Sequence, residues 1–154
     1  MSKDKIIDRA KIKDIITQRK NEGKRVVFTN GCFDIIHAGH VRYLTEAKKL
    51  GDILVIGLNS DSSVSTIKPG RPIIPEQQRA EVLSALSMVD YITLFNEDTP
   101  YELIKEIKPD ILVKGADWDI KNIVGNDIVK EVHTIPFVKG ISTTEIIKKI
   151  QSKK

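Results

Sequence analysis

The chain of 154 residues has 40% hydrophobic and 30% charged residues and a formal net charge of +4, proportions that are typical of a soluble globular protein. This length suits one domain with a full core and is short for two. The longest apolar runs are only as long as strands, and the start MSKDKIIDRAK lacks the apolar core of a secretory signal. We therefore expect a cytoplasmic protein that does not enter a membrane.

The single cysteine excludes an internal disulfide and fits a reducing compartment. Only 5% of the residues are aromatic, and they do not alternate with basic residues as they do on many nucleic-acid surfaces. A modest positive charge spread along the chain suits an anionic small molecule. We therefore expect a small-molecule ligand and no nucleic-acid partner.

Apolar residues recur at roughly helical spacing among charges at the start of the chain, and Gly23 stands where such a helix would stop. This pattern predicts an amphipathic helix within residues 1–24. We expect it to pack on one domain formed by residues 25–154.

From there the sequence alternates short apolar runs with helical patterns. We expect strands over residues 25–29, 53–58, 91–95, 111–113 and 134–138. We expect helices over residues 39–50, 76–87, 99–107, 126–132 and 143–150, with a polar loop over 59–72. This alternation predicts an α/β protein with a Rossmann-like, doubly wound, parallel sheet of five strands in the order 3-2-1-4-5.

Residues 29–40, TNGCFDIIHAGH, join the first predicted strand to the following helix. The first amides of a helix are unpaired and carry the positive end of the helix dipole, so an anion binds there readily. Gly31 and Gly39 let a ligand approach the main chain, and His37 and His40 share one helix face. The segment therefore predicts a phosphate site, although glycine at such a turn also serves turn formation alone.

Other classes of site fit this segment less well. Cys32, His37 and His40 supply too few ligands for a structural zinc site, and the remaining histidine, His133, lies far along the chain. The glycine-rich Rossmann fingerprint, the P-loop pattern and HExxH are all absent.

In a doubly wound sheet, ligands bind at the carboxyl ends of the strands where the strand order reverses. Strands one and four flank that point in the predicted order. The loop after strand four reads Lys114, Gly115, Ala116, Asp117, Trp118. We therefore expect it to face residues 29–40 across a crevice.

The run GCFDIIHAGH, residues 31–40, resembles the signature of the HxGH nucleotidyltransferases, and the whole chain from about residue 11 to 150 is similar to the bacterial heptose 1-phosphate adenylyltransferases. KGAD after strand four, GLNSD and GRPIIPEQQRAEVLSAL after strand two, and ISTTEII before the last helix carry the narrower resemblance. Residues 130–133 depart from it, because many relatives have a glycine pair there. The identity of the sugar therefore stays open at this stage.

The resemblance implies a set of site residues. The catalytic residues it implies are His37, His40 and Lys114. The nucleotide-binding residues it implies are Thr29, Asn30, Gly31, Cys32, Phe33, Gly39, Asn59, Asp61, Ser142, Thr143 and Thr144. The substrate-binding residues it implies are Asp34, Lys48, Arg71, Arg79, Gly115, Asp117 and Trp118. For Ser142 to Thr144 and Lys48 the sequence also allows simpler roles, a helix cap and an exposed lysine.

The resemblance implies transfer of AMP from ATP to a sugar 1-phosphate, most closely D-glycero-D-manno-heptose 1-phosphate, to give ADP-heptose and pyrophosphate. Mg²⁺ would enter with ATP and be held by phosphates and water instead of by protein ligands. The resemblance also implies a homodimer, with a separate sugar kinase and phosphatase supplying the substrate. Two alternatives are a cytidylyltransferase acting on glycerol 3-phosphate or a related phospho-alcohol, and a non-catalytic nucleotide-binding module.

Overall fold

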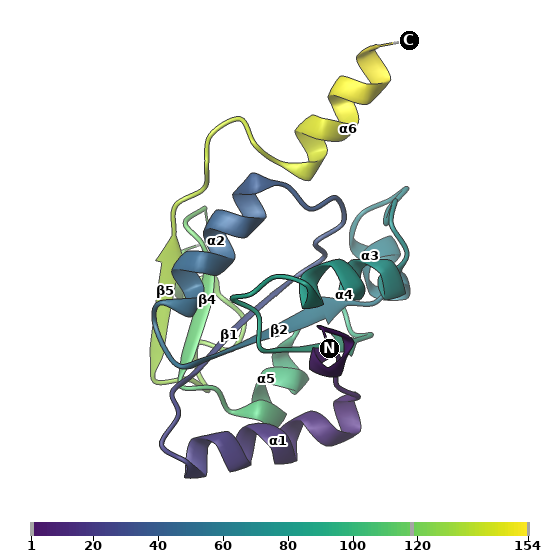
Figure 1. The fold of residues 1–154 in the computed structure, drawn as a ribbon. Helices are drawn as coiled ribbons and strands as arrows, with labels where there is room; N and C mark the ends of the chain where they lie inside the picture. The colour runs from purple at the N-terminus through teal and green to yellow at the C-terminus, as the bar shows by residue number, and fades with distance from the viewer. Residues whose placement is uncertain (1, 118, 154) are drawn as a thin grey trace.

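A computed structural model describes residues 2–117 and 119–153, and it contains one five-stranded sheet in which all the strands are parallel (Figure 1). The strands are β1 (Val26–Gly31), β2 (Ile53–Asn59), β3 (Tyr91–Phe95), β4 (Ile111–Gly115) and β5 (Glu131–Ile135). Their order is β3-β2-β1-β4-β5. The predicted fold class and strand order are therefore confirmed.

Helices connect the strands and cover both faces of the sheet (Figure 1). The α-helices are α1 (Arg9–Asn21), α2 (Ala38–Lys48), α3 (Asp61–Ile67), α4 (Glu76–Ser84), α5 (Tyr101–Ile107) and α6 (Thr143–Ser152). Two short 3-10 helices are η1 (Ser2–Lys5) and η2 (Ile120–Asn122). None of the helices in the described ranges is both long and apolar enough to cross a membrane.

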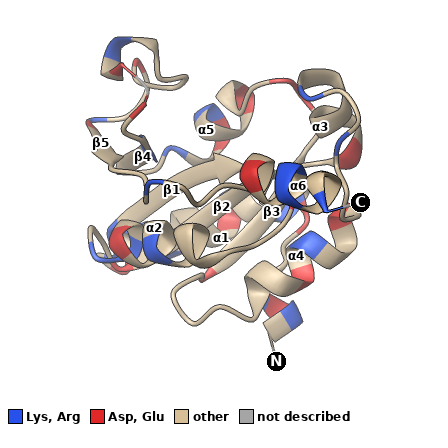
Figure 2. Cartoon of the chain, turned by 90° about the horizontal axis from the view of Figure 1, so that it is seen from above, with Lys and Arg blue, Asp and Glu red and all other residues tan. Residues whose placement is uncertain are grey.

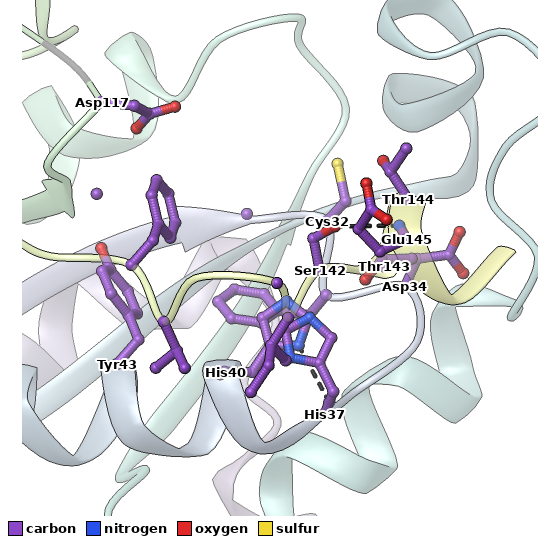
Figure 3. Close-up of a pocket in the computed structure, with 18 of the residues that line it drawn as sticks. Cys32, Asp34, His37, His40, Tyr43, Asp117, Ser142, Thr143, Thr144 and Glu145 are labelled. Carbon is purple, nitrogen blue, oxygen red and sulfur yellow. Dashed lines mark hydrogen bonds between the residues drawn. The ribbon is translucent and has the colours of Figure 1, made fainter. Parts of the chain in front are cut away.

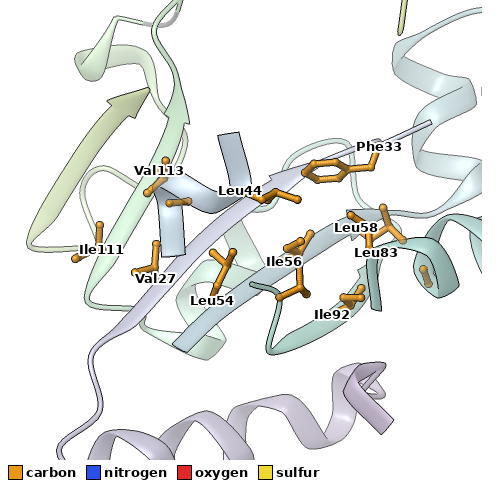
Figure 4. Close-up of a cluster of buried hydrophobic side chains, with 13 residues drawn as sticks. Val27, Phe33, Leu44, Leu54, Ile56, Leu58, Leu83, Ile92, Ile111 and Val113 are labelled. Atoms are coloured by element: carbon orange, nitrogen blue, oxygen red, sulfur yellow. The ribbon is translucent and has the colours of Figure 1, made fainter. Parts of the chain in front are cut away.

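The core has two layers because β1 and β2 are buried on both faces and carry no charged residue (Figure 2). On one face, Leu44 of α2 and Leu83 of α4 pack against Leu54 and Ile56 (Figure 4). On the other face, α1 and α5 cover the sheet, and Ile16 of α1 is fully buried there. The helix predicted within residues 1–24 therefore belongs to the core.

Two predicted elements are wrong around β5. No helix forms over residues 126–132: residues 126–128 lie in turns, because Gly125 has a φ of +94° and its carbonyl closes a turn to the Ile128 amide at 2.9 Å, and residues 131–132 belong to β5. The last strand covers Glu131–Ile135 instead of residues 134–138. It ends there because the next residue, Pro136, has no N–H to continue the ladder.

One helix was missed, because its serine-rich sequence was interpreted as part of a polar loop. Ser60 caps the start of α3, where its Oγ accepts from the Ser63 amide at 3.2 Å. Val64 then buries its side chain completely. A local cap and one buried apolar side chain were enough to make a helix of a stretch with weak periodicity.

A crevice opens between β1 and β4 at their carboxyl ends. The two strands pair only through Val27 with Ile111 and Phe28 with Leu112, although both run further. Beyond these pairs, the Thr29 hydroxyl bridges the gap by donating to the Val113 carbonyl at 3.0 Å. The switch in strand order thus separates the loops that follow the two strands, as the topology predicted.

Candidate functional site

A cavity of about 660 Å³ lies at this crevice (Figure 3), a size that is usual for small-molecule sites. Most of its lining comes from the loop after β1, the start of α2, the end of β4 and the segment between β5 and α6. Of the predicted site residues it contains Asn30, Gly31, Cys32, Phe33, Asp34, His37, Gly39, His40, Arg71, Lys114, Gly115, Asp117, Ser142, Thr143 and Thr144.

The two histidines lie against each other at the start of α2. Their rings stack with centroids 3.8 Å apart and planes inclined by 24°. The His37 amide donates to Nδ1 of His40 at 3.3 Å (Figure 3). Because Nδ1 accepts, the proton of a neutral His40 resides on Nε2. His40 is therefore held in one tautomer and can donate a hydrogen bond from Nε2.

The residues around the histidines fix this arrangement. A Cβ on Gly39 would lie 2.9 Å from Cε1 and Nδ1 of His37, so the imidazole needs a glycine there. Phe33 packs its ring 5.2 Å from that of His40, and it adopts a φ of +46°. Non-glycine residues seldom occupy this region, and backbone strain of this kind concentrates at functional sites.

Both histidines are neutral at pH 7. Burial, with smaller contributions from the neighbouring His37 and Lys68, lowers the pKa of His40 to about 4. Burial also lowers the pKa of His37. The pair therefore offers N–H donors without a positive charge.

Two buried polar atoms of the cavity lining have no hydrogen-bond partner among the described residues. They are Nδ1 of His37 and Oδ1 of Asn30. Buried polar atoms without partners are rare in proteins, and an ion or a ligand commonly supplies the missing partner. These two atoms therefore indicate that a polar ligand binds in the cavity.

Asp34 organises the part of the cavity wall that carries Arg71. Its carboxylate, whose side chain is fully buried, accepts from Nε of Arg71 at 2.7 Å and from the amides of Ile73 and Ile74 at 2.9 and 2.8 Å. Burial would raise the pKa of Asp34, but these amides and the guanidinium hold it below its ordinary value. Asp34 thus ties the loop carrying Arg71 to the cavity rim.

Lys114, at the end of β4, adds a cation to the lining. Burial lowers its pKa, while Cys32 and Asp117 act in the opposite direction and Lys68 adds to the lowering. Tyr43, one helical turn after His40, also lines the cavity, and its burial raises the pKa of the phenol to about 12. The lysine therefore lies among groups of mixed charge.

The start of α6 forms another wall. Oγ of Ser142 accepts from the Glu145 amide at 3.1 Å, and the Thr143 hydroxyl donates to the Ile35 carbonyl at 3.1 Å. This second contact fastens α6 to the loop after β1. The amino ends of α2 and α6 therefore meet at one cavity, which makes it suited to an extended polyanion.

Arg79 is fully buried below the site and does not line the cavity. Its guanidinium donates to the carbonyls of Cys32 and Asn59 at 2.7 and 2.8 Å and to the Asp61 carboxylate at 2.8 Å. Asn59 itself donates to Ser63 at 3.0 Å. Three predicted site residues therefore join the loops after β1 and β2, namely Arg79, Asn59 and Asp61.

Two other predicted residues also lie outside the cavity. Nζ of Lys48 is 2.6 Å from the Asp90 carboxylate and donates to the Asp52 carbonyl, so it stands at the amino ends of β2 and β3. Thr29 is buried in the β1–β4 bridge described above. A third residue, Trp118, falls outside the described residues.

Several lining residues are not among the predicted site residues, and they include Tyr43, Lys68 and Phe137. Tyr43 follows His40 by three residues, so helical spacing was a usable signal. Lys68 and Phe137 lie in irregular segments, and only the folded chain brings them to the cavity.

Comparisons with known proteins show what this chain is similar to. Residues 28–149 match the model of a family described as cytidylyltransferase-like. A bifunctional protein HldE from Wolinella succinogenes is 54% identical over 151 residues, which are 97% of this chain and 32% of that protein. The chain thus spans about a third of the length of this curated relative.

Two solved structures are also similar. A lipopolysaccharide core biosynthesis protein from Thermoplasma volcanium has 35% identity and a TM-score of 0.64, over 76% of this chain and 98% of that chain. A pantoate-beta-alanine ligase from Francisella tularensis, with 18% identity and a TM-score of 0.60 over 96% of this chain and 76% of that chain, shares the fold. The family match covers most of the chain, and the chain belongs to the cytidylyltransferase-like family.

Proposed function

We propose that the chain transfers AMP from ATP to D-glycero-D-manno-heptose 1-phosphate, giving ADP-heptose and pyrophosphate. The observation that carries the proposal is the meeting of two helix amino ends, α2 and α6, at one cavity with the stacked His37 and His40. Such a site suits a triphosphate. The bifunctional HldE relative, the lipopolysaccharide core biosynthesis protein and the resemblance to heptose 1-phosphate adenylyltransferases support the choice of sugar.

In the proposed reaction, an oxygen of the sugar 1-phosphate attacks the α-phosphorus of ATP and pyrophosphate leaves. The attacking phosphate is already ionised, so no protein base is required. The imidazoles donate hydrogen bonds to the phosphate oxygens as charge spreads over them, and Lys114 balances that charge. Catalysis then rests on alignment and on donors fixed in advance, in keeping with the single tautomer of His40.

Mg²⁺ fits this proposal as a partner of the nucleotide. Within residues 2–117 and 119–153, no three His, Cys, Asp or Glu side chains gather in a way that would hold a metal. A triphosphate supplies the oxygen ligands that Mg²⁺ prefers, with water completing the shell. Bound in this way, the ion would neutralise phosphate charge. We place the reaction in the cytoplasm, where ATP is supplied.

Pyrophosphate release measured with ATP, CTP and GTP against heptose 1-phosphates and glycerol 3-phosphate tests the function. We expect ATP with a D-glycero-D-manno-heptose 1-phosphate to give the highest kcat/KM. Preference for CTP with glycerol 3-phosphate would support the second candidate, which the family's cytidylyltransferase-like description favours. ATP binding without turnover on any phosphate would point to a non-catalytic nucleotide-binding module.

A further inference from the structure

Phe137 has an unusual position for a large apolar residue. It exposes 62% of its surface, and yet it lines the cavity. It follows Pro136, just after β5 ends. The Ala116 amide donates to the Ile135 carbonyl at 3.0 Å, which joins the ends of β4 and β5. The phenyl ring therefore stands on a firmly held part of the sheet edge, with much of its surface open.

The ring rests against Gly115. A Cβ on that residue would lie 2.3 Å from Cζ of Phe137 and 2.8 and 3.0 Å from the two Cε atoms. Any other residue at 115 would therefore push the ring away. The glycine therefore gives Phe137 its place at the end of β4.

Apart from Lys114, which precedes Gly115 in β4, the groups that we expect to bind phosphate lie away from this part of the cavity. In Figure 3, Asp117 and Tyr43 lie on one side of the view and Thr144 and Asp34 on the other, with the histidines between them. A nucleotide whose phosphates are held between the amino ends of α2 and α6 can therefore extend its base toward the end of β4. Arg71, which is paired with Asp34, is a cation available to a second anion such as the sugar phosphate.

We propose that Phe137, seated on Gly115, is the stacking platform for the nucleobase of the bound nucleotide. The inference rests on the proposed function, since it requires a nucleotide in this cavity. A flat π-system is the part of ATP that matches an exposed phenyl ring, whereas the sugar phosphate is polar throughout. Base stacking on an aromatic side chain changes affinity on the order of 10- to 100-fold.

Calorimetric binding to the full-length chain tests the platform, with Mg-ATP and inorganic tripolyphosphate as probes with and without a base. We expect Phe137→Ala to weaken ATP binding on the order of 10- to 100-fold and tripolyphosphate binding less than about twofold. Phe137→Tyr should retain the affinity for ATP. Ile150→Ala removes another exposed apolar side chain, 65% exposed in α6, and should change neither affinity.

Gly115→Ala provides an independent test, because the three atoms nearest to its Cβ all belong to the far end of the Phe137 side chain and the ring can swing aside. We expect this substitution to weaken ATP binding in the wild type and to add nothing in the Phe137→Ala background. Additive losses, equal losses for both probes, or wild-type affinities that do not differ between ATP and tripolyphosphate would each overturn the platform. If the binding results agree with stacking on Phe137 but heptose 1-phosphate gives no turnover, only the proposed reaction is wrong.

Discussion

The backbone amide of His37 donates to Nδ1 of His40 at 3.3 Å while the two imidazoles stack at 3.8 Å. One interaction therefore fixes the tautomer of His40 and the other fixes the plane of its ring. Both rings are partly buried, and the resulting loss of solvation lowers the pKa of each and favours the uncharged form. The pair is prepared to donate before any ligand arrives.

The first prediction concerns the protonation of His40. Nitrogen-15 NMR of the imidazoles in the free protein should show the Nε2–H tautomer and a titration midpoint near 4. Since an unfolded chain takes up this proton near pH 6.5, the unfolded state binds more protons between pH 6.5 and 4, and stability falls as the pH falls through that range.

Urea denaturation at pH 7 and pH 5 checks the same prediction through stability. His40→Gln should lose less stability between these pH values than the wild type does. A midpoint at or above 6.5, or a wild-type pH dependence unchanged by the substitution, would contradict it.

The second prediction concerns the catalytic contribution of His40. His40→Ala should fold normally and lower kcat by at least about a hundredfold, which is the usual loss when a transition-state donor is removed. His133→Ala is the matched control, because His133 lies on β5 with 43% of its side chain exposed. Pyrophosphate release at saturating substrates is the measurement. Near-normal release by His40→Ala would exclude the assignment.

The third prediction concerns Asp34 as a positioning residue. Asp34→Asn replaces an oxygen that accepts hydrogen bonds from the loop carrying Arg71, and hydrogen bonds to a charged group contribute about 1.5–3 kcal/mol. We expect a stability loss of that order at pH 7. We also expect KM for the sugar phosphate to rise more than KM for ATP, because Arg71 loses its orientation.

Asp14→Asn, on the exposed side of α1, controls for the loss of a charge. Because the pKa of Asp34 is held below 3.8, its contribution persists at higher pH and is lost as the pH falls through the lowered value. An unchanged KM for the sugar phosphate would show that Asp34 does not act through Arg71.

The fourth prediction concerns Arg79 as a buried tie between loops. Arg79→Met leaves the carbonyls of Cys32 and Asn59 without their donor. Removing one member of a buried charged network costs about 3–5 kcal/mol, so urea denaturation should show a loss of that order. Arg42→Met, at an exposed position of α2, should change stability by less than about 0.5 kcal/mol. Equal effects of the two substitutions would disprove this role.

The sequence by itself determined the fold class and the strand order. Apolar runs such as those of β1 and β2 alternate with helical segments, and the rules for parallel crossovers allow few arrangements of such a pattern. It also determined which loops face each other, because the carboxyl ends of β1 and β4 meet at the switch point. The segment around His37 and His40 was therefore found at the correct place.

Only the tertiary structure decided which side chains reach the cavity. Arg79 and Lys48 are polar residues of the predicted site, but long-range partners hold them elsewhere, and no local pattern encodes such partners. Phe137 lies after a strand whose position the sequence pattern misjudged by three residues, and only contact with Gly115 reveals its place. Periodicity reports which face is buried, whereas the partner of each polar group depends on residues far apart in the chain.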